Sequence, residues 1–387
     1  TCFDKMTLSD ALFECSGAGV VGKPLRMIKE VTENLNIRIQ GDSDPSRYRQ
    51  LSNCLGQGTV FAPTGTGVTM ASTLEFNMAE LEAEIVYEDE DFTLTPQSGP
   101  ITLEPLIFVD DMHNSCKDSK ESAAMGTAIT KTLNELKMEA HSEKSGLLIF
   151  GKNKDKLKEE VETNPTFIQD FKMGYKDSEV YLGMQFSANG SNDSIMMTLE
   201  ARRLKCNIKA MELRRKLLDD RVMGVGWLAT AITVFNASIV STLTYGCCSW
   251  VGMLKKHTDH LEQTQRQCLY SVLDISRTST YRNLLSICGI MPANDTVRKL
   301  KIGFINELVH MKKNGICYDT LMAEYNRGEI KTLMDEVEEY CMYFNIDNVV
   351  DRYMKKVQVT VTKSRYPRRG EQLGLAVSGN LKCGRAM

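Results

Sequence analysis

The stretch "IFVDDMHNS", residues 107–115, places two adjacent carboxylates directly after a short apolar run. Strands are depleted of Asp, and neighbouring like charges repel each other. Two interpretations fit Asp110 and Asp111. They are either an acidic turn exposed at the end of a strand, or a pair of oxygen ligands whose repulsion is neutralised by a divalent cation such as Mg²⁺. Taken alone, these nine residues leave both interpretations open.

The surrounding sequence predicts a mixture of strands and helices. Apolar runs predict strands over 101–109, 145–151 and 179–187, and "NIRIQ" predicts a short strand over 36–40. Asp118 and Glu121 stand at capping-box spacing before a helix. Further helices are expected over 7–15, 21–35 and about 61–86, and nearly throughout the chain after residue 195. One helix face after the cap carries four apolar residues: Met125, Ile129, Leu133 and Leu136.

Length and composition indicate a globular protein with room for two or three domains. The chain has 387 residues, of which 42% are hydrophobic and 25% charged, and its formal net charge is −3. This net charge does not mark a nucleic-acid-binding protein, but positive charge gathers over 202–216 and 352–369, and negative charge over 75–92. A locally basic face can follow a phosphate backbone, although a solvated helix face gives the same pattern.

The twelve cysteines and the longest apolar run exclude several classes of protein. The cysteines form no regular framework, which favours reduced thiols in an intracellular protein. The run "VGWLATAITVFNASIVSTLTYG" (225–246) contains Asn236 and several Ser and Thr, so a buried helix is expected rather than a membrane span. Cysteines and histidines crowd between 247 and 268, but their spacing matches no standard zinc finger.

Several short motifs, in order, resemble those of one polymerase family. They are "CFDKM" (2–6), "GQG" followed by "AP" (56–63), "FVDD" (108–111), "EKSGLLIF" (143–150), "YLGMQF" (181–186), "STLTYGCCSW" (241–250) and "LEQTQRQCLYSVLDIS" (261–276). Together they resemble reverse transcriptases of non-LTR (LINE-type) retrotransposons, from residue 1 to about 315. The resemblance implies an α+β fold: a palm with a ferredoxin-like antiparallel sheet (1–190), then a helical thumb (191–255) and a C-terminal helical region (256–387).

The implied activity is that of an RNA-directed DNA polymerase. Such an enzyme uses two Mg²⁺ ions to join a dNTP to the 3′-hydroxyl of a primer, so its partners would be template RNA, a DNA primer and dNTPs, with no membrane involved. The alternative is a non-catalytic nucleic-acid-binding or structural remnant of such an element. The template and the target site are not indicated by the sequence.

The resemblance also assigns roles to individual residues. Asp110 and Asp111 would be metal ligands, and Lys144 would donate a proton to the leaving pyrophosphate, although a lone Lys is more commonly a surface residue. Other residues would contact substrates: Phe3 as a steric gate beneath the sugar, Gln57 and Gly58 against template and nucleotide, and Tyr181, Leu182 and Gly183 in a primer-grip hairpin. An ordinary loop and an ordinary hairpin are the alternatives for the last two sets.

The first motif implies an incomplete set of metal ligands. In the family, its first Asp binds metal, and that residue would lie just upstream of Thr1. Asp4 matches the end of the motif and is not expected to replace it. The chain is therefore expected to be an inactive fragment whose fingers also lie upstream. Four thumb residues are expected to bind phosphate: Arg202, Arg203, Arg214 and Arg215.

Overall fold

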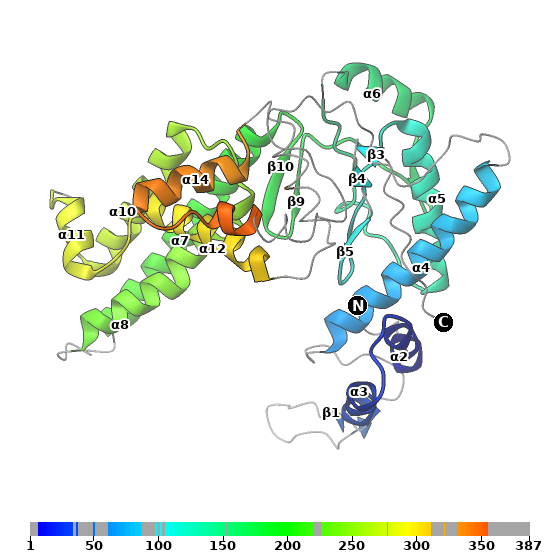
Figure 1. Cartoon of the computed structure of the whole chain (residues 1–387), viewed down its shortest axis with the longest axis horizontal. Coiled ribbons are helices and arrows are strands. Elements are labelled where there is room, and N and C mark those ends of the chain that lie inside the picture. Colours follow the sequence, from blue (N-terminus) through cyan, green and yellow to red (C-terminus); the bar gives the residue numbers. More distant parts are fainter. Residues whose placement is uncertain are drawn as a thin grey trace. The chain divides into compact units, whose positions relative to one another are not determined.

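The computed structural model describes residues 7–33, 36–37, 49–50, 61–86, 97–98, 101–102, 105–151, 153–219, 226–276, 278–310, 321 and 331–354. The chain divides into two compact units, residues 1–176 and 177–387 (Figure 1). This boundary lies before the hairpin of β9 (Ser178–Tyr181) and β10 (Met184–Ser187), whereas residue 190 was predicted from the sequence as the end of the palm. The hairpin belongs to the second unit because β10 packs against the long helix that follows it.

The first unit combines helices with short hairpins. Its helices are α2 (Leu8–Gly17), α3 (Lys23–Glu33), α4 (Phe61–Val86), α5 (Ser119–Glu135) and α6 (Lys154–Thr163). Its strands pair in antiparallel twos: β1 (Asn36–Ile37) with β2 (Arg49–Gln50), β3 (Gln97–Ser98) with β4 (Ile101–Thr102), β5 (Leu106–Phe108) with β6 (Asp111–His113), and β7 (Phe167–Ile168) with β8 (Phe171–Lys172).

The predicted cap begins α5. The Asp118 carboxylate accepts a hydrogen bond from the Glu121 N–H (2.9 Å), and the Glu121 carboxylate accepts one from the Lys117 N–H (2.8 Å). Met125, Ile129 and Leu133 are buried, as predicted, and Leu136 packs against the same core.

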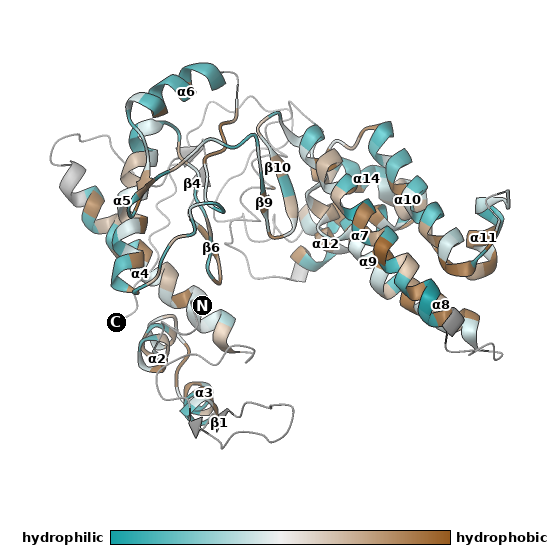
Figure 2. Ribbon diagram, turned by 180° about the vertical axis from the view of Figure 1, so that it is seen from behind, coloured by the Kyte–Doolittle hydropathy of each residue, from teal (hydrophilic) through white to brown (hydrophobic). Residues whose placement is uncertain are grey.

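The core of the first unit lies between α2, α4 and α5. Its buried residues are largely those of three helix faces: Ala11, Met70, Leu74, Met78, Met125, Ala128, Ile129 and Leu133. Gly126 lets α5 approach β7 closely, because a Cβ at that position would lie 2.5 Å from the Phe167 carbonyl oxygen. Helix α6 buries only Val161 and is almost entirely hydrophilic in Figure 2.

In its described residues, the second unit consists of one hairpin followed by helices. Strands β9 (Ser178–Tyr181) and β10 (Met184–Ser187) precede α7 (Ser191–Asp219), α8 (Trp227–Val234), the π-helix η1 (Phe235–Val240), α9 (Ser241–Thr244), the 3-10 turn η2 (Cys247–Ser249), α10 (Lys255–Leu273), α11 (Tyr281–Cys288), α12 (Ala293–His310) and α14 (Leu333–Phe344). One core extends from Ile195 to Val297, so residues 191–255 share an apolar cluster with residues 256–297. A second cluster extends from Ile302 to Tyr353.

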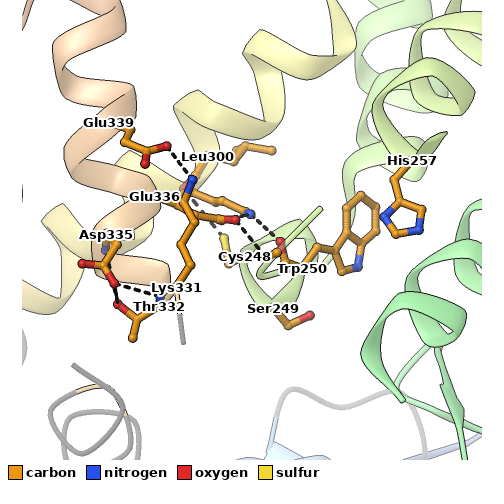
Figure 3. A network of polar contacts seen from close by, with 12 residues as sticks. Cys248, Ser249, Trp250, His257, Leu300, Lys331, Thr332, Asp335, Glu336 and Glu339 are labelled. Atoms are coloured by element: carbon orange, nitrogen blue, oxygen red, sulfur yellow. Dashed lines mark hydrogen bonds and ion pairs between the residues drawn. The ribbon is translucent and has the colours of Figure 1, made fainter. Parts of the chain in front are cut away.

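A buried ion pair joins the later helices to the turn after η2. The Lys301 ammonium lies 2.7 Å from the Glu336 carboxylate and also donates to the Trp250 carbonyl oxygen, and Glu336 accepts from the Gly252 N–H at 2.8 Å (Figure 3). Both charged side chains are almost fully buried. The pair therefore fixes α12 and α14 to the turn that carries Trp250.

The apolar run predicted as a buried helix forms α8, η1 and α9, and η2 follows directly after it. Over Trp227–Ser249 it is long and apolar enough to cross a membrane by length and composition alone. Ala231, Phe235, Ile239 and Leu243 are fully buried in the core of the second unit. Side chains of α7 bond carbonyls of the π-helix, with Lys209 donating to the Ser238 oxygen at 3.5 Å.

The α+β class is confirmed at the level of mixed helices and small antiparallel sheets. The predicted strand over 145–151 is wrong: Leu147 forms only an isolated parallel bridge with Tyr175. Its N–H donates to the Gly174 oxygen (2.9 Å), and its oxygen accepts from the Lys176 N–H (3.0 Å). Pairing is limited to this point, and Leu147 contacts the core without a continuous ladder.

Candidate functional site

The two aspartates lie at the tip of the β5–β6 hairpin. Ile107 pairs with Met112 and Phe108 pairs with Asp111, so Val109 and Asp110 form a two-residue turn. The side chains of Ile107 and Met112 pack against the core between α4 and α5. The alternating direction of strand residues then sends the Phe108 and Asp111 side chains to the opposite face.

The outer face of this hairpin is exposed. Phe108 is 56% exposed and Leu106 is 43% exposed, and both aspartates lie at the surface. Helix α4 passes close to the turn, since a Cβ on Gly67 would lie 3.9 Å from the Val109 nitrogen. A core that holds one face of the hairpin thus presents two carboxylates and a large aromatic ring on the other.

Val109 adopts a backbone conformation that its side chain disfavours. Its φ is 62°, in the left-handed region, where a β-branched residue is an outlier. The first position of such a turn normally carries Gly. Strain of this kind costs on the order of 1–3 kcal/mol and gathers at functional sites. Here the strained residue directly precedes Asp110.

The aspartates suit Mg²⁺ in the kind of ligand they offer. Mg²⁺ is usually bound by one or two carboxylates together with substrate phosphates. In the part of the chain that the structure describes, no group of three or more His, Cys, Asp or Glu residues could hold a metal ion. A cation bound at Asp110 and Asp111 would therefore need further ligands from water, from substrate or from residues outside the described part.

Lys144 lies in an exposed turn between α5 and the Leu147 bridge. Its N–H donates to the His141 carbonyl oxygen at 3.1 Å, which closes the turn. The side chain is at the surface, as both the catalytic and the ordinary interpretation require. Its role remains a prediction.

The predicted primer-grip residues form the tip of the β9–β10 hairpin. Tyr181 pairs with Met184, which leaves Leu182 and Gly183 as a two-residue turn. Both have positive φ, 47° and 76°, as a type I′ turn requires. Leu182 and Gly183 are exposed, and the Tyr181 side chain is half-buried.

Three predicted site residues, Phe3, Gln57 and Gly58, lie outside the described residues, as does Asp4. The structure brings predicted site residues together in two hairpins: Asp110 and Asp111 at the β5–β6 turn, and Tyr181, Leu182 and Gly183 at the β9–β10 turn. The turn residues of β9–β10 belong to the second unit.

The expectation for the basic residues of α7 is wrong for Arg202. Its side chain is buried, and its guanidinium donates to the carbonyl oxygens of Tyr245 and Gly183. Burial lowers the Arg202 pKa to about 10. Arg214 pairs with Asp274 at 2.6 Å. The exposed cations of the segment are Arg203, Lys205, Arg215 and Lys216.

The buried position of Arg202 was not predicted, because a cluster of basic residues in the sequence does not show which face of the helix is buried. The periodicity of the buried residues Leu199, Cys206 and Ala210 could have revealed it, since Arg202 falls on the same face.

Comparison with known proteins adds no relative. Neither the models of protein families nor the curated protein sequences give a significant match to this chain.

Proposed function

We propose that this chain is the palm and thumb of an RNA-directed DNA polymerase of the non-LTR retrotransposon type. The observation that supports it best is the Asp110–Asp111 hairpin: two exposed carboxylates on a strained turn, backed by a core that fixes their strand. The choice of this family rests on the resemblance of the ordered sequence motifs to those of non-LTR reverse transcriptases. The reaction would join a dNTP to the 3′-hydroxyl of a DNA primer paired with template RNA.

In this proposal, Asp110 and Asp111 hold Mg²⁺. Bound there, the cations would stabilise negative charge on the attacking and leaving oxygens. The protein's own contribution is to fix the two carboxylates: Ile107 and Met112 anchor the hairpin in the core, and the two-residue turn leaves little freedom at its tip. Such pre-organisation is the main way in which a protein promotes phosphoryl transfer.

The exposed cations of α7 would bind the nucleic-acid backbone. Arg203, Lys205, Arg215 and Lys216 offer charge without a fixed geometry, which suits contact with phosphate in any sequence. The same cations also suit the alternative function, a non-catalytic nucleic-acid-binding remnant. The two proposals differ in whether binding responds to metal at the aspartates.

A binding experiment separates the two. The probe is an RNA–DNA hybrid with a recessed primer that ends in a dideoxynucleotide, so that no chemistry occurs, together with the next complementary dNTP. We expect Mg²⁺ to tighten binding about tenfold, equivalent to about 1.4 kcal/mol. The Asp110→Asn/Asp111→Asn variant should lose this effect.

Asp170→Asn is the matched control. Asp170 is an exposed residue at the second position of the two-residue β7–β8 turn, and the preceding Gln169 also has positive φ (50°). This control should respond to Mg²⁺ as the wild type does. Binding of the wild type that ignores Mg²⁺ and the dNTP would favour the non-catalytic remnant and contradict the polymerase.

A further inference from the structure

Cys247 and Cys248 are adjacent thiols with different surroundings. Both lie in the turn η2, which follows Gly246, a residue with positive φ (62°). Cys247 is 1% exposed and belongs to the core of the second unit. Cys248 is partly exposed, and its sulfur lies 3.7 Å from the Leu300 carbonyl oxygen of α12 (Figure 3). One thiol is therefore held in the core while its neighbour remains accessible.

The two thiols are hydrogen-bonded to each other, and this bond separates their acidities. It raises the pKa of Cys247, and burial raises that pKa further. The same bond lowers the pKa of Cys248; burial and the Glu307 carboxylate oppose this shift, the Lys301 ammonium supports it, and the net direction is downward. A hydrogen bond to the charged form of a group favours that form. The Cys247 thiol thus donates to the Cys248 sulfur and stabilises it as a thiolate.

Among the cysteines that the structure describes, Cys248 alone combines partial exposure with a lowered pKa. Burial raises the pKa of four others, namely Cys15, Cys206, Cys268 and Cys288. Cys116 is also partly exposed, but burial and the Glu121 and Asp118 carboxylates raise its pKa to about 12. Because the thiolate is the reactive form of cysteine, Cys248 is the nucleophile of this set.

A bond between the sulfurs of Cys247 and Cys248 would be strained and therefore easy to reduce. Disulfides ordinarily join residues whose Cα atoms are about 4.4–6.8 Å apart, whereas adjacent Cα atoms across a trans peptide are about 3.8 Å apart. Strained disulfides are the labile ones, in contrast to the permanent cross-links of secreted proteins. Such a bond is suited to forming and breaking again.

We propose that Cys247 and Cys248 form a reversible redox site, which a hydroperoxide oxidises to a disulfide between the two neighbours. The Cys248 thiolate attacks one peroxide oxygen, which breaks the O–O bond, gives a sulfenic acid and releases the other oxygen as hydroxide or alkoxide. The Cys247 thiol then loses its proton and attacks the Cys248 sulfur, so that the S–S bond forms and the sulfenic oxygen leaves as water. The two thiols lose two electrons, and the peroxide gains them. This inference does not rest on the proposed function.

Peptide mapping of the full chain tests the proposal. The reduced chain is treated with hydrogen peroxide, unfolded and alkylated with N-ethylmaleimide, and trypsin then releases residues 222–255, whose two cysteines are Cys247 and Cys248. We expect this peptide to lose two hydrogen atoms and to take up no maleimide, and a reducing dithiol to restore both thiols. Cys116 is the matched control and should be oxidised about tenfold more slowly, because little of it is thiolate.

Single serine variants separate the two roles. In Cys247→Ser a hydroxyl still donates to the Cys248 sulfur, but no thiol remains to displace the sulfenic oxygen, so Cys248 should be labelled by dimedone, which traps sulfenic acids. In Cys248→Ser the buried Cys247 should remain a thiol and take up one maleimide after unfolding. Circular dichroism shows whether each variant folds. Should either fail to fold, the mass of the wild-type peptide still decides the proposal.

Several results would overturn the proposal. Residues 222–255 that keep their reduced mass under peroxide would exclude the disulfide, and so would a bond from either cysteine to another part of the chain or to a second copy. Oxidation of Cys116 as fast as Cys248 would show indiscriminate reaction. Dimedone on Cys247 in Cys248→Ser would assign the nucleophile to the wrong thiol, and oxidation that a dithiol does not reverse would exclude a reversible site.

Discussion

At the scale of single residues, two hairpin turns share an unusual backbone conformation but differ in the hydrogen bonds that stabilise it. Val109 and Gln169 both occupy the first position of a two-residue hairpin turn with positive φ. The Gln169 amide is hydrogen-bonded on every side: it donates to the Met138 oxygen (2.9 Å) and the Asn134 oxygen (3.1 Å), and it accepts from the Ala140 N–H (2.9 Å). Val109 has no polar group to offset its strain.

We therefore predict opposite effects of glycine at the two positions. Val109→Gly relieves strain of about 1–3 kcal/mol at an entropic cost of about 0.5–1 kcal/mol, so the free energy of unfolding should rise by about 1 kcal/mol. Gln169→Gly removes three hydrogen bonds and should lower it by about 1–2 kcal/mol. Urea unfolding measures both. A Val109→Gly variant less stable than the wild type would show that the turn is not strained.

Residue patterns in the sequence were enough to predict local features but not long-range ones. The Asp118 cap and the buried face of α5 follow from spacing alone, and both are confirmed. The carbonyl partners of Arg202 come from residues 183 and 245, far away in the chain, so no local pattern could reveal them. Likewise the strain at Val109 depends on the register of the hairpin, which an apolar run does not determine.

At the scale of elements, the Lys301–Glu336 pair fixes two helices to one turn. A buried ion pair is costly to break, because removing one partner leaves the other charge unpaired. We predict that Lys301→Met lowers the free energy of unfolding by about 3–5 kcal/mol. Lys301→Met/Glu336→Gln should recover much of this loss, since Gln still offers an oxygen to the Gly252 N–H and no charge remains.

The exposed pair of Lys331 and Glu339 is the control for this cycle. Its charged atoms lie 2.6 Å apart, close to the 2.7 Å of the buried pair, but both side chains are about half exposed (Figure 3). Water screens such a pair, so Lys331→Met should change stability by less than about 1 kcal/mol. A double variant at 301 and 336 as unstable as the single variant would show that the two charges are not coupled.

Element types were more predictable than their pairing. Helices α2 to α5 and the helices of the second unit are present where helices were expected. The strand over 145–151 failed because an apolar run indicates burial, whereas a strand needs a neighbour along its whole length. Leu147 meets residues 174–176 at one point only.

At the scale of the whole molecule, acid should destabilise the second unit through α10. His257 and His260 are buried, and burial lowers the pKa of each below its usual value. Among the residues that the structure describes, neither ring nitrogen of His260 has a hydrogen-bond partner. Because the unfolded imidazoles have the higher pKa, they bind protons first as the pH falls.

We therefore predict that the free energy of unfolding is highest above about pH 6.5 and falls progressively below it. His260→Leu removes one of the two groups and should make this fall shallower without loss of stability at pH 8. Urea unfolding at intervals from pH 8 to pH 5 provides the measurement. The same pH dependence in His260→Leu and in the wild type would exclude His260 as a source of acid sensitivity.

The salt dependence of nucleic-acid binding reports how many phosphates the exposed cations of α7 contact. Each phosphate contact contributes about 0.7–0.9 to the slope of log affinity against log salt. Replacing Arg203, Lys205, Arg215 and Lys216 by Ala should lower the slope on an RNA–DNA hybrid, with similar losses on all sequences. Replacing Lys154, Lys156 and Lys158 of α6 is the control. Equal slopes for the wild type and the α7 variant would show that these four cations do not contact phosphate.

The proposed polymerase requires that Asp110 and Asp111 hold a divalent cation at the 3′ end of a primer. Replacing Mg²⁺ by Fe²⁺ with ascorbate tests it most directly, because the bound ion generates radicals that cut whatever lies beside it. We predict cuts in the primer at its 3′ terminus and in the protein near residues 107–115. Both should be lost in Asp110→Asn and kept in Asp170→Asn. Cuts that persist in Asp110→Asn, or that fall away from the primer terminus, would exclude a metal site at these two aspartates.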